Sequence, residues 1–296
     1  MLLMCVIMAF GQITLKYTAT DMSPTLQIAL RSGGAAGLIV LMAVWQRQPL
    51  FMVQGGWLPG IVAGGLFASE FFLVGEALRY TTASHVIIFL YTAPIFAALG
   101  LHFLIPAERL NRIQWSGVIL AFIGLTISFL GRDASENTAT SPNMLLGDIL
   151  AIGAGLLWGL TTVVVRSTRL KTARATETLL YQLIMAFVVL GLGTIFMGQT
   201  AVTWTLALSA SLFYQAVILS YGALLLWFWL LRKYLASRLG VLSYMTPLFG
   251  VIFGAVLLDE VLDKGFLLGA VCVIMGFLLV SAQEWLVKYK PNNKRQ

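Results

Sequence analysis

The chain has 296 residues, of which 59% are hydrophobic and only 10% are charged, and its mean hydropathy is +0.89. An average soluble domain has about 25% charged residues, so this composition excludes an ordinary water-soluble globule. It also excludes a disordered chain, which needs low hydrophobicity and high charge. A porin-type barrel is disfavoured because its strands alternate apolar and polar residues over about ten positions, and no such alternation is present here.

Ten apolar segments follow one another along the chain, and a bilayer crossing takes about twenty apolar residues. No positive charge precedes the first segment, so we interpret it as a retained helix and not as a signal peptide. We predict an all-α polytopic membrane protein with ten transmembrane helices. The expected spans are 1–19, 25–45, 55–78, 82–104, 113–131, 145–165, 178–198, 206–231, 239–258 and 265–283.

The lysines and arginines indicate the orientation of these segments. If the N-terminus is cytoplasmic, fourteen of the 19 lie in cytoplasmic connections or in the C-terminal tail, four lie outside, and Arg31 lies within a span. The positive-inside rule then predicts that both termini are cytoplasmic and that the number of crossings is even. The net charge of +7 lies in short connections and indicates no nucleic-acid partner.

The stretch 83–127 resembles the stretch 236–279, which indicates an internal repeat. Because each repeat has five helices, the second enters the membrane from the opposite side, so the repeats are inverted, as in alternating-access transporters. We expect a first repeat at 1–131, a polar external connector at 132–144, a second repeat at 145–283 and a basic cytoplasmic tail at 284–296. The matched residues are Ala83-Ser84 with Ala236-Ser237, Tyr91 with Tyr244, Pro94 with Pro247, Glu108 with Glu260, Gly117 with Gly269 and Gly124 with Gly276.

Two five-helix repeats, a fourth helix that begins Ala-Ser and has a central proline, and a following Glu108-Arg109 together resemble the EamA-like family of the drug/metabolite transporter superfamily. The resemblance covers nearly the whole chain. It implies a bacterial inner-membrane carrier that exports amino acids or other small metabolites, and some members take solutes up. It also implies that the fifth helix of each repeat lies outside the cavity. The sequence departs from the family pattern at Pro106-Ala107 and at Val261.

Ionisable residues inside a span are costly in lipid and usually face the bundle interior or a water-filled cavity. At 1.5 Å per residue, Arg31 and Glu70 should lie roughly 10–12 Å below the external face, so they could form an ion pair or share a cavity. With Gln12 and His85 they would line an outward-opening cleft. The alternative is a buried strut between two helices. His85 could be either an interfacial histidine or a proton relay.

The second half is expected to contain no equivalent buried charge and to have a polar but uncharged interior. We expect a proline within a helix to free the carbonyl four residues back, so Pro94 and Pro247 are candidate hinges, the alternative being passive kinks. Two cysteines in apolar runs give neither a disulfide framework nor a metal-ligand spacing, and no cofactor is expected. Further candidates for substrate binding or gating are Tyr91, Tyr244, Trp158, Gln182 and Ser243.

These patterns favour a secondary transporter of small organic solutes, most simply an exporter of amino acids or related metabolites. The chain has no P-loop for ATP, and no nucleophile–base set or HExxH motif for catalysis, so an enzyme is not expected. A channel would show a selectivity filter or a ring of charge. The expected partners are a small-molecule solute and the lipid bilayer, with the protein as a monomer or homodimer. An uptake carrier of the same fold, or less simply a membrane-embedded enzyme or scaffold, remains the alternative.

Overall fold

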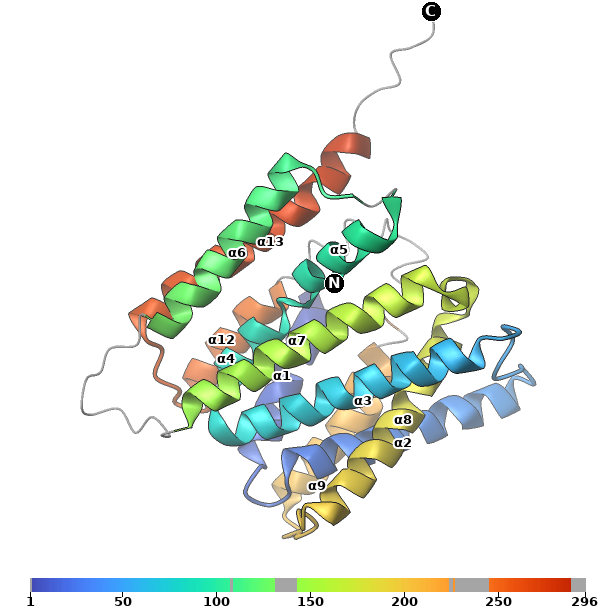
Figure 1. Cartoon of the computed structure of the whole chain (residues 1–296). Coiled ribbons are helices and arrows are strands. Elements are labelled where there is room, and N and C mark those ends of the chain that lie inside the picture. Colours follow the sequence, from blue (N-terminus) through green and yellow to red (C-terminus); the bar gives the residue numbers. More distant parts are fainter. Residues whose placement is uncertain (1, 107–108, 131–142, 224–225, 227–244, 289–296) are drawn as a thin grey trace, which may run out of the picture.

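The structure is a computed structural model that describes residues 2–106, 109–130, 143–223, 226 and 245–288 (Figure 1). Within these ranges the regular structure is helical, and two short connections form an isolated antiparallel bridge between Met22 and Val202. The helices are α1 (Leu2–Tyr17), α2 (Pro24–Trp45), α3 (Trp57–Tyr80), α4 (Ala83–Leu90), α5 (Ala93–Leu104), α6 (Arg112–Leu130), α7 (Met144–Ser167), the 3₁₀-helix η2 (Arg169–Thr172), α8 (Ala175–Phe196), α9 (Leu206–Phe213), the π-helix η3 (Tyr214–Ala223), α12 (Met245–Leu257) and α13 (Lys264–Lys288).

The described helices lie where the apolar segments of the sequence predict them. Six are long and apolar enough to cross a membrane, counting α4 with α5 and α9 with η3 as single spans. Four shorter apolar helices match the expected spans 1–19, 113–131, 239–258 and 265–283, and two of them begin one residue before the span, at Arg112 and Lys264. The prediction of an all-α membrane protein is therefore confirmed for the part of the chain that the structure describes.

Local sequence sets the starts of three helices at one end of the molecule. The hydroxyls of Ser23, Thr82 and Thr205 each accept a hydrogen bond from a backbone N–H in the first turn of α2, α4 and α9, respectively. Serine and threonine are preferred N-caps because they satisfy one of the otherwise unpaired N–H groups. In α2 the capping serine is followed directly by Pro24, whose fixed φ suits the first helical position.

The two halves of the chain are interleaved. Helix α7 of the second half packs against α3, α4 and α5 of the first, and α8 packs against α2 and α3. Helix α1 in turn packs against α12, and α6 against α13 (Figure 1). Most of the packing between helices therefore joins one half to the other.

Helices α6 and α13 approach each other closely at glycines. A Cβ atom built on Gly117 would collide with the carbonyl oxygen of Gly276, and one built on Gly124 would lie 2.6 Å from the carbonyl oxygen of Gly269. Small residues at such crossings let two helix backbones touch inside a membrane. The pair lies at the side of the molecule, with α5 as its neighbour (Figure 1).

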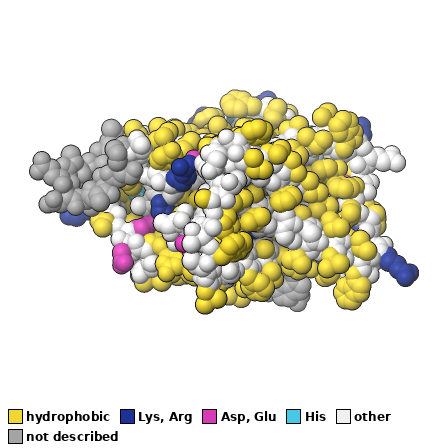
Figure 2. Space-filling model, turned by 90° about the horizontal axis from the view of Figure 1, so that it is seen from below, with side chains coloured by type: hydrophobic (Ala, Val, Ile, Leu, Met, Phe, Trp, Pro, Cys, Tyr) yellow, Lys and Arg dark blue, Asp and Glu magenta, His cyan; other side chains and the backbone are white. Residues whose placement is uncertain are grey.

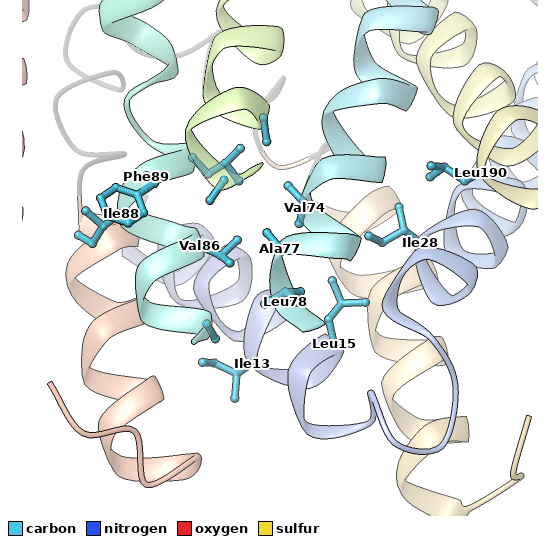
Figure 3. Packing of buried hydrophobic residues seen from close by; sticks show 14 of the residues in the cluster. Ile13, Leu15, Ile28, Val74, Ala77, Leu78, Val86, Ile88, Phe89 and Leu190 are labelled. Carbon is cyan, nitrogen blue, oxygen red and sulfur yellow. The ribbon is translucent and has the colours of Figure 1, made fainter. Parts of the chain in front are cut away.

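The buried and exposed surfaces are those of a protein that lies in lipid. Phe89 of α4, Val74 and Leu78 of α3 and Ile13 of α1 belong to one buried apolar cluster at the centre of the bundle (Figure 3). Large apolar side chains also cover the outer face, while charged side chains gather toward the two ends in Figure 2. Phe196, for example, is 85% exposed. In a bilayer such side chains contact lipid tails and not water.

Two ends of the bundle are distinguished below. The Asp21 end holds the connections 18–23, 81–82, 197–205 and 258–263 and the start of α7, which hydrogen bonds join to one another. The Arg169 end holds the connections 46–56 and 168–174, where Arg169 donates to the backbone carbonyl of Gln54.

Candidate functional site

Arg31 and Glu70 are buried in the bundle on neighbouring helices. Arg31 of α2 is 6% exposed and Glu70 of α3 is 3% exposed. The Arg31 guanidinium lies 4.7 Å from the centre of the Phe71 ring, a cation–π distance. Arg31 and Glu70 are close enough to interact electrostatically, but they form no ion pair within 4.0 Å.

Several polar atoms of these buried residues have no hydrogen-bond partner among the described residues. Within the part of the chain that the structure describes, no hydrogen bond is made by the Arg31 guanidinium, and the buried Oε2 atom of Glu70 has no partner. The buried Oε1 atom of Gln12 on α1 is unpartnered in the same way. Buried polar groups are normally hydrogen-bonded, and unsatisfied ones require an explanation such as a missing ligand or water. Gln12 and Glu70 thus each keep an unsatisfied buried oxygen, and Glu70 lies within electrostatic range of Arg31.

One helical turn before Arg31, Gln27 forms a polar junction that the sequence analysis missed. Its amide nitrogen donates to the carbonyl oxygens of Met22 and Thr18, and its Oε1 accepts from Gln215 at 3.2 Å. Gln215 lies in the π-helix η3, so this junction joins α2 to the second half. π-Helical turns are rare and often occur at functional sites. The spacing Gln27–Arg31, four residues apart on one face of α2, was the available signal.

The expected span 82–104 is interrupted next to an aromatic pair. The chain turns at Tyr91 and Thr92, between α4 and α5, with Pro94 in the first turn of α5. The ring of Tyr91 meets the indole of Trp158 edge to face, with the ring centroids 5.4 Å apart. Gly155 of α7 lies against the carbonyl oxygens of the interrupted turn. The predicted residues Tyr91, Pro94 and Trp158 therefore lie together, and a hinge role for Pro94 stays a prediction.

The remaining predicted site residues are less informative. Gln182 is half-buried on α8, and Pro247 is buried near the start of α12. Ser243 and Tyr244 lie outside the described residues. Among the described residues, no group of three or more His, Cys, Asp or Glu side chains could hold a metal ion.

Hydrogen bonds join the two halves at the Asp21 end. Asp21 accepts from the hydroxyl of Thr205 at 2.6 Å, and the Asp21 carbonyl accepts from the N–H of Thr203. The amide of Gln199 donates to Glu76 at 3.0 Å, while the Gln199 carbonyl accepts from the hydroxyl of Ser23. In this conformation the end is therefore held together by short-range polar contacts.

A buried acid–base pair lies in the same region. Nδ1 of His85 on α4 is 3.1 Å from both carboxylate oxygens of Asp148 on α7, and Oδ1 of Asp148 also accepts from the hydroxyl of Thr81 at 2.6 Å. His85 is 1% exposed and Asp148 is fully buried. The structure thus pairs His85 with a residue of the second half and does not place it in contact with Gln12, Arg31 or Glu70.

The prediction that the second half contains no buried charge is wrong. Asp148 is fully buried and Glu177 is 1% exposed, although each lies within a few residues of a helix start. Residues so near a span end would ordinarily lie in the interface. Here Gly147 of α7 lies directly against Thr81, and this close approach encloses the neighbouring Asp148. Glu177 accepts a hydrogen bond from the backbone N–H of Val53 across the Arg169 end.

Glu260 is a further acidic group at the Asp21 end, and it caps α4. Its carboxylate accepts from the backbone N–H groups of Ala83 at 2.6 Å and Ser84 at 3.0 Å, and from the Ser84 hydroxyl at 2.5 Å. A carboxylate at a helix N-terminus satisfies unpaired N–H groups and interacts favourably with the helix dipole. The sequence identifies Glu260 only as the repeat partner of Glu108, not as a cap.

Two surface hollows formed by the described residues lie away from these polar groups. One apolar groove lies between α5 and α6 and is lined by Leu99, Trp115, Phe122 and neighbouring residues. Several of its lining side chains are among the exposed apolar residues, so it belongs to the lipid-facing surface. A second, shallow hollow at the Arg169 end is lined by the 55–59 and 167–171 segments. We therefore base the candidate site on the buried polar residues.

Comparison with known proteins identifies the family. The model of the EamA-like transporter family matches residues 1–130 and 145–282. An uncharacterised transporter of Archaeoglobus fulgidus is 31% identical over 229 residues, which are 74% of this chain and 72% of that protein. A probable amino-acid metabolite efflux pump of Salmonella typhimurium is 26% identical over 289 residues, covering 94% of this chain and 92% of the relative.

A solved structure supports the fold independently. It is a crystal structure of a protein that superimposes with a TM-score of 0.64 at 18% identity, over 96% of each chain. Together with the apolar helices, these matches show a multi-pass membrane transporter and not an enzyme. The chain belongs to the EamA-like transporter family.

Proposed function

We propose that this protein is a secondary carrier that exports amino acids or related small metabolites across the bacterial inner membrane by alternating access. The observation that carries the proposal is the buried Arg31, whose guanidinium makes no hydrogen bond to the described residues although it lies inside the bundle. An arginine fork matches a carboxylate in geometry and charge. A solute carboxylate would supply the missing acceptor, and Glu70 would attract a solute amino group.

The packing between helices supports an architecture of ten helices in two inverted repeats. If the repeats are related by a two-fold axis, each contact between halves must have a mate in which the two partners are exchanged. In the repeat, α1 corresponds to α7, α4 to α12 and α3 to η3. The α1–α12 contact therefore requires an α7–α4 contact, and the α3–α7 contact requires an η3–α1 contact; both are present. The glycines of α6 and α13 follow the same rule. Gly117 corresponds to Gly269 and Gly124 to Gly276, and both the Gly117–Gly276 and the Gly124–Gly269 contacts are present.

The distribution of charge supports an orientation in which the Arg169 end is cytoplasmic. Its connections carry Arg47, Arg169, Lys171 and Arg174, and Arg166 lies in the adjoining last turn of α7. The Asp21 end would then face the outside, and the cross-half bonds there would close the outward path to Arg31. In this orientation both termini lie in the cytoplasm, as the positive-inside rule requires.

The names of relatives favour the same substrate class. Two proteins that match over more than nine-tenths of this chain are named probable amino-acid metabolite efflux pumps, one from Salmonella typhimurium and one from Escherichia coli. Export of amino acids or their metabolites therefore agrees with the buried Arg31 and Glu70. No observation favours uptake, a catalytic role or a scaffold over export.

Counterflow in liposomes tests the proposal. Purified protein is reconstituted with one unlabelled amino acid or organic acid inside, and entry of the same labelled solute is followed. A carrier accelerates exchange, whereas an enzyme or scaffold does not. Exchange of at least one carboxylate-bearing solute is expected. Equal rates with protein-free liposomes across the whole panel would contradict the proposal.

Variants of Arg31 and Glu70 separate a binding site from a structural strut. Removing one member of a buried charge pair typically costs about 3–5 kcal/mol, because the other charge is left uncompensated. Arg31→Met and Glu70→Met should therefore each impair the protein, and the double variant should recover normal expression and thermal stability. If the residues bind solute, the double variant remains inactive in counterflow. If it exchanges solute at the wild-type rate, the pair is only a strut.

Cysteine labelling tests the orientation. A single cysteine at Ser135, in a background without Cys5 and Cys272, should react with an impermeant thiol reagent on intact cells. A cysteine in the tail 284–296 should react only after the membrane is permeabilised. The reverse pattern would overturn the proposed orientation.

A further inference from the structure

The shallow hollow at the Arg169 end combines basic and apolar side chains. It lies where the end of α7 and the 3₁₀-helix η2 meet the first turn of α3. Arg169 and Lys171 line it and are exposed, and none of the described residues in its lining is acidic. Trp57 and Leu58, on the α3 side, are 61% and 56% exposed. Tryptophan is enriched at the level of the lipid headgroups, so the hollow opens at the membrane surface.

The positive charge around the hollow has no acid to balance it. The connections 46–56 and 168–174 contain four basic residues and no aspartate or glutamate. Nη1 of Arg169 donates to the carbonyl oxygen of Gln54 at 3.2 Å, and its other N–H groups donate to no described residue. Lys171 likewise forms no hydrogen bond or ion pair with the described part of the chain. Both cations are therefore available to an anion.

Exposed apolar side chains continue from the hollow along both helices. They are Leu58, Ile61 and Val62 on α3 and Leu156 and Leu160 on α7. On each helix they share a face with a residue that lines the hollow, Leu58 on α3 and Ser167 on α7, because residues three or four apart lie on one side of a helix. Since α3 packs against α7, a hydrocarbon chain lying along these faces would extend from the hollow into the membrane.

We propose that this hollow binds one anionic phospholipid, with its phosphate between Arg169 and Lys171 and its acyl chains along the exposed faces of α3 and α7. Arginine and lysine form strong charge-assisted hydrogen bonds to phosphate. Basic pockets between membrane helices recognise anionic headgroups in this way. A free phosphate would use the two cations but not the apolar faces, so the combination favours a lipid. In the proposed orientation the lipid belongs to the cytoplasmic leaflet.

A lipid bound here would also join the two halves of the chain. The segment 55–59 belongs to the first half and the segment 167–171 to the second, and the hollow is formed by both. A ligand that binds only the folded protein stabilises it by mass action. Anionic phospholipid should therefore raise the unfolding temperature of the protein more than a zwitterionic lipid with the same acyl chains.

Native mass spectrometry of the purified protein in a neutral detergent tests the site without any transport. The protein is titrated with dioleoyl phosphatidylglycerol, and dioleoyl phosphatidylcholine is the control for headgroup charge. Lys171→Gln should weaken binding of phosphatidylglycerol about fivefold, the effect of one basic residue near an anionic lipid. This variant breaks no hydrogen bond or ion pair with a described residue, so it should fold normally. Unchanged binding in Lys171→Gln would overturn the proposal.

A pair of double variants separates the hollow from general surface charge. Arg169→Gln with Lys171→Gln removes two cations from the hollow. Arg109→Gln with Arg112→Gln removes two exposed cations near the start of α6, which do not line the hollow. Only the first double variant should lose phosphatidylglycerol, and equal losses in both would overturn the site. Competition by glycerol phosphate at the concentration of the lipid would show a site for free anions and would overturn the assignment to a lipid.

Discussion

The crossing of α6 and α13 gives a test of the fold that needs no substrate. A Cβ on Gly276 would lie 2.6 Å from the backbone nitrogen of Ala121 and would also collide with the carbonyl oxygen of Gly117. Backbone atoms cannot relieve the clash by a change of rotamer, as a side chain can, so Gly276→Ala must push the two helices apart. Overpacking of this kind typically costs about 1–3 kcal/mol. The separation also weakens the Cα–H···O contacts that close helix crossings provide.

Gly37 on α2 provides the matched control. It also lies inside an apolar helix, but a Cβ there meets no atom within 4 Å. Gly37→Ala should therefore stabilise the protein by about 0.5–1 kcal/mol through helix propensity alone. Because both variants gain this term, the difference between them isolates the cost of the crossing, about 1–3 kcal/mol.

Reversible unfolding in mixed micelles, followed by circular dichroism, measures both variants against wild type. Gly276→Ala should unfold at a lower denaturant fraction and Gly37→Ala at the same or a higher one. Equal unfolding free energies for the two variants would refute the backbone contact between α6 and α13. Gly269→Ala, at the repeat-related position, should behave like Gly276→Ala.

Two further predictions concern the Asp21 end. Glu260→Ala leaves three donors at the start of α4 without their acceptor, so it should lower the unfolding free energy by about 1–3 kcal/mol. An unchanged unfolding free energy in this variant would contradict the capping role. A disulfide between Met22→Cys and Val202→Cys should stop counterflow, and a reductant should restore it, because the connection would otherwise have to part in each transport cycle; undiminished exchange by the oxidised protein would show that this end does not open.

The sequence alone determined the class of the protein. Apolar runs of bilayer length leave helices as the simplest structure in which every backbone polar group is satisfied in lipid. The same reasoning predicts that Arg31, Glu70 and Gln12 lie at one depth, because position along a helix converts directly into distance. It also placed Tyr91 and Pro94 at a local disturbance of their span. These inferences need only the geometry of a single helix.

Tertiary structure decided which residues meet across the two halves. From its position close to the start of its span, Asp148 would be predicted to lie at the membrane interface. It is buried because Gly147 lets α7 approach Thr81 closely. The pairing of Asp148 with His85 and the capping of α4 by Glu260 depend in the same way on how separate helices pack. The position of a residue along one helix predicts its depth in the membrane. The residue that it contacts on another helix is decided only when helices distant in the chain pack together.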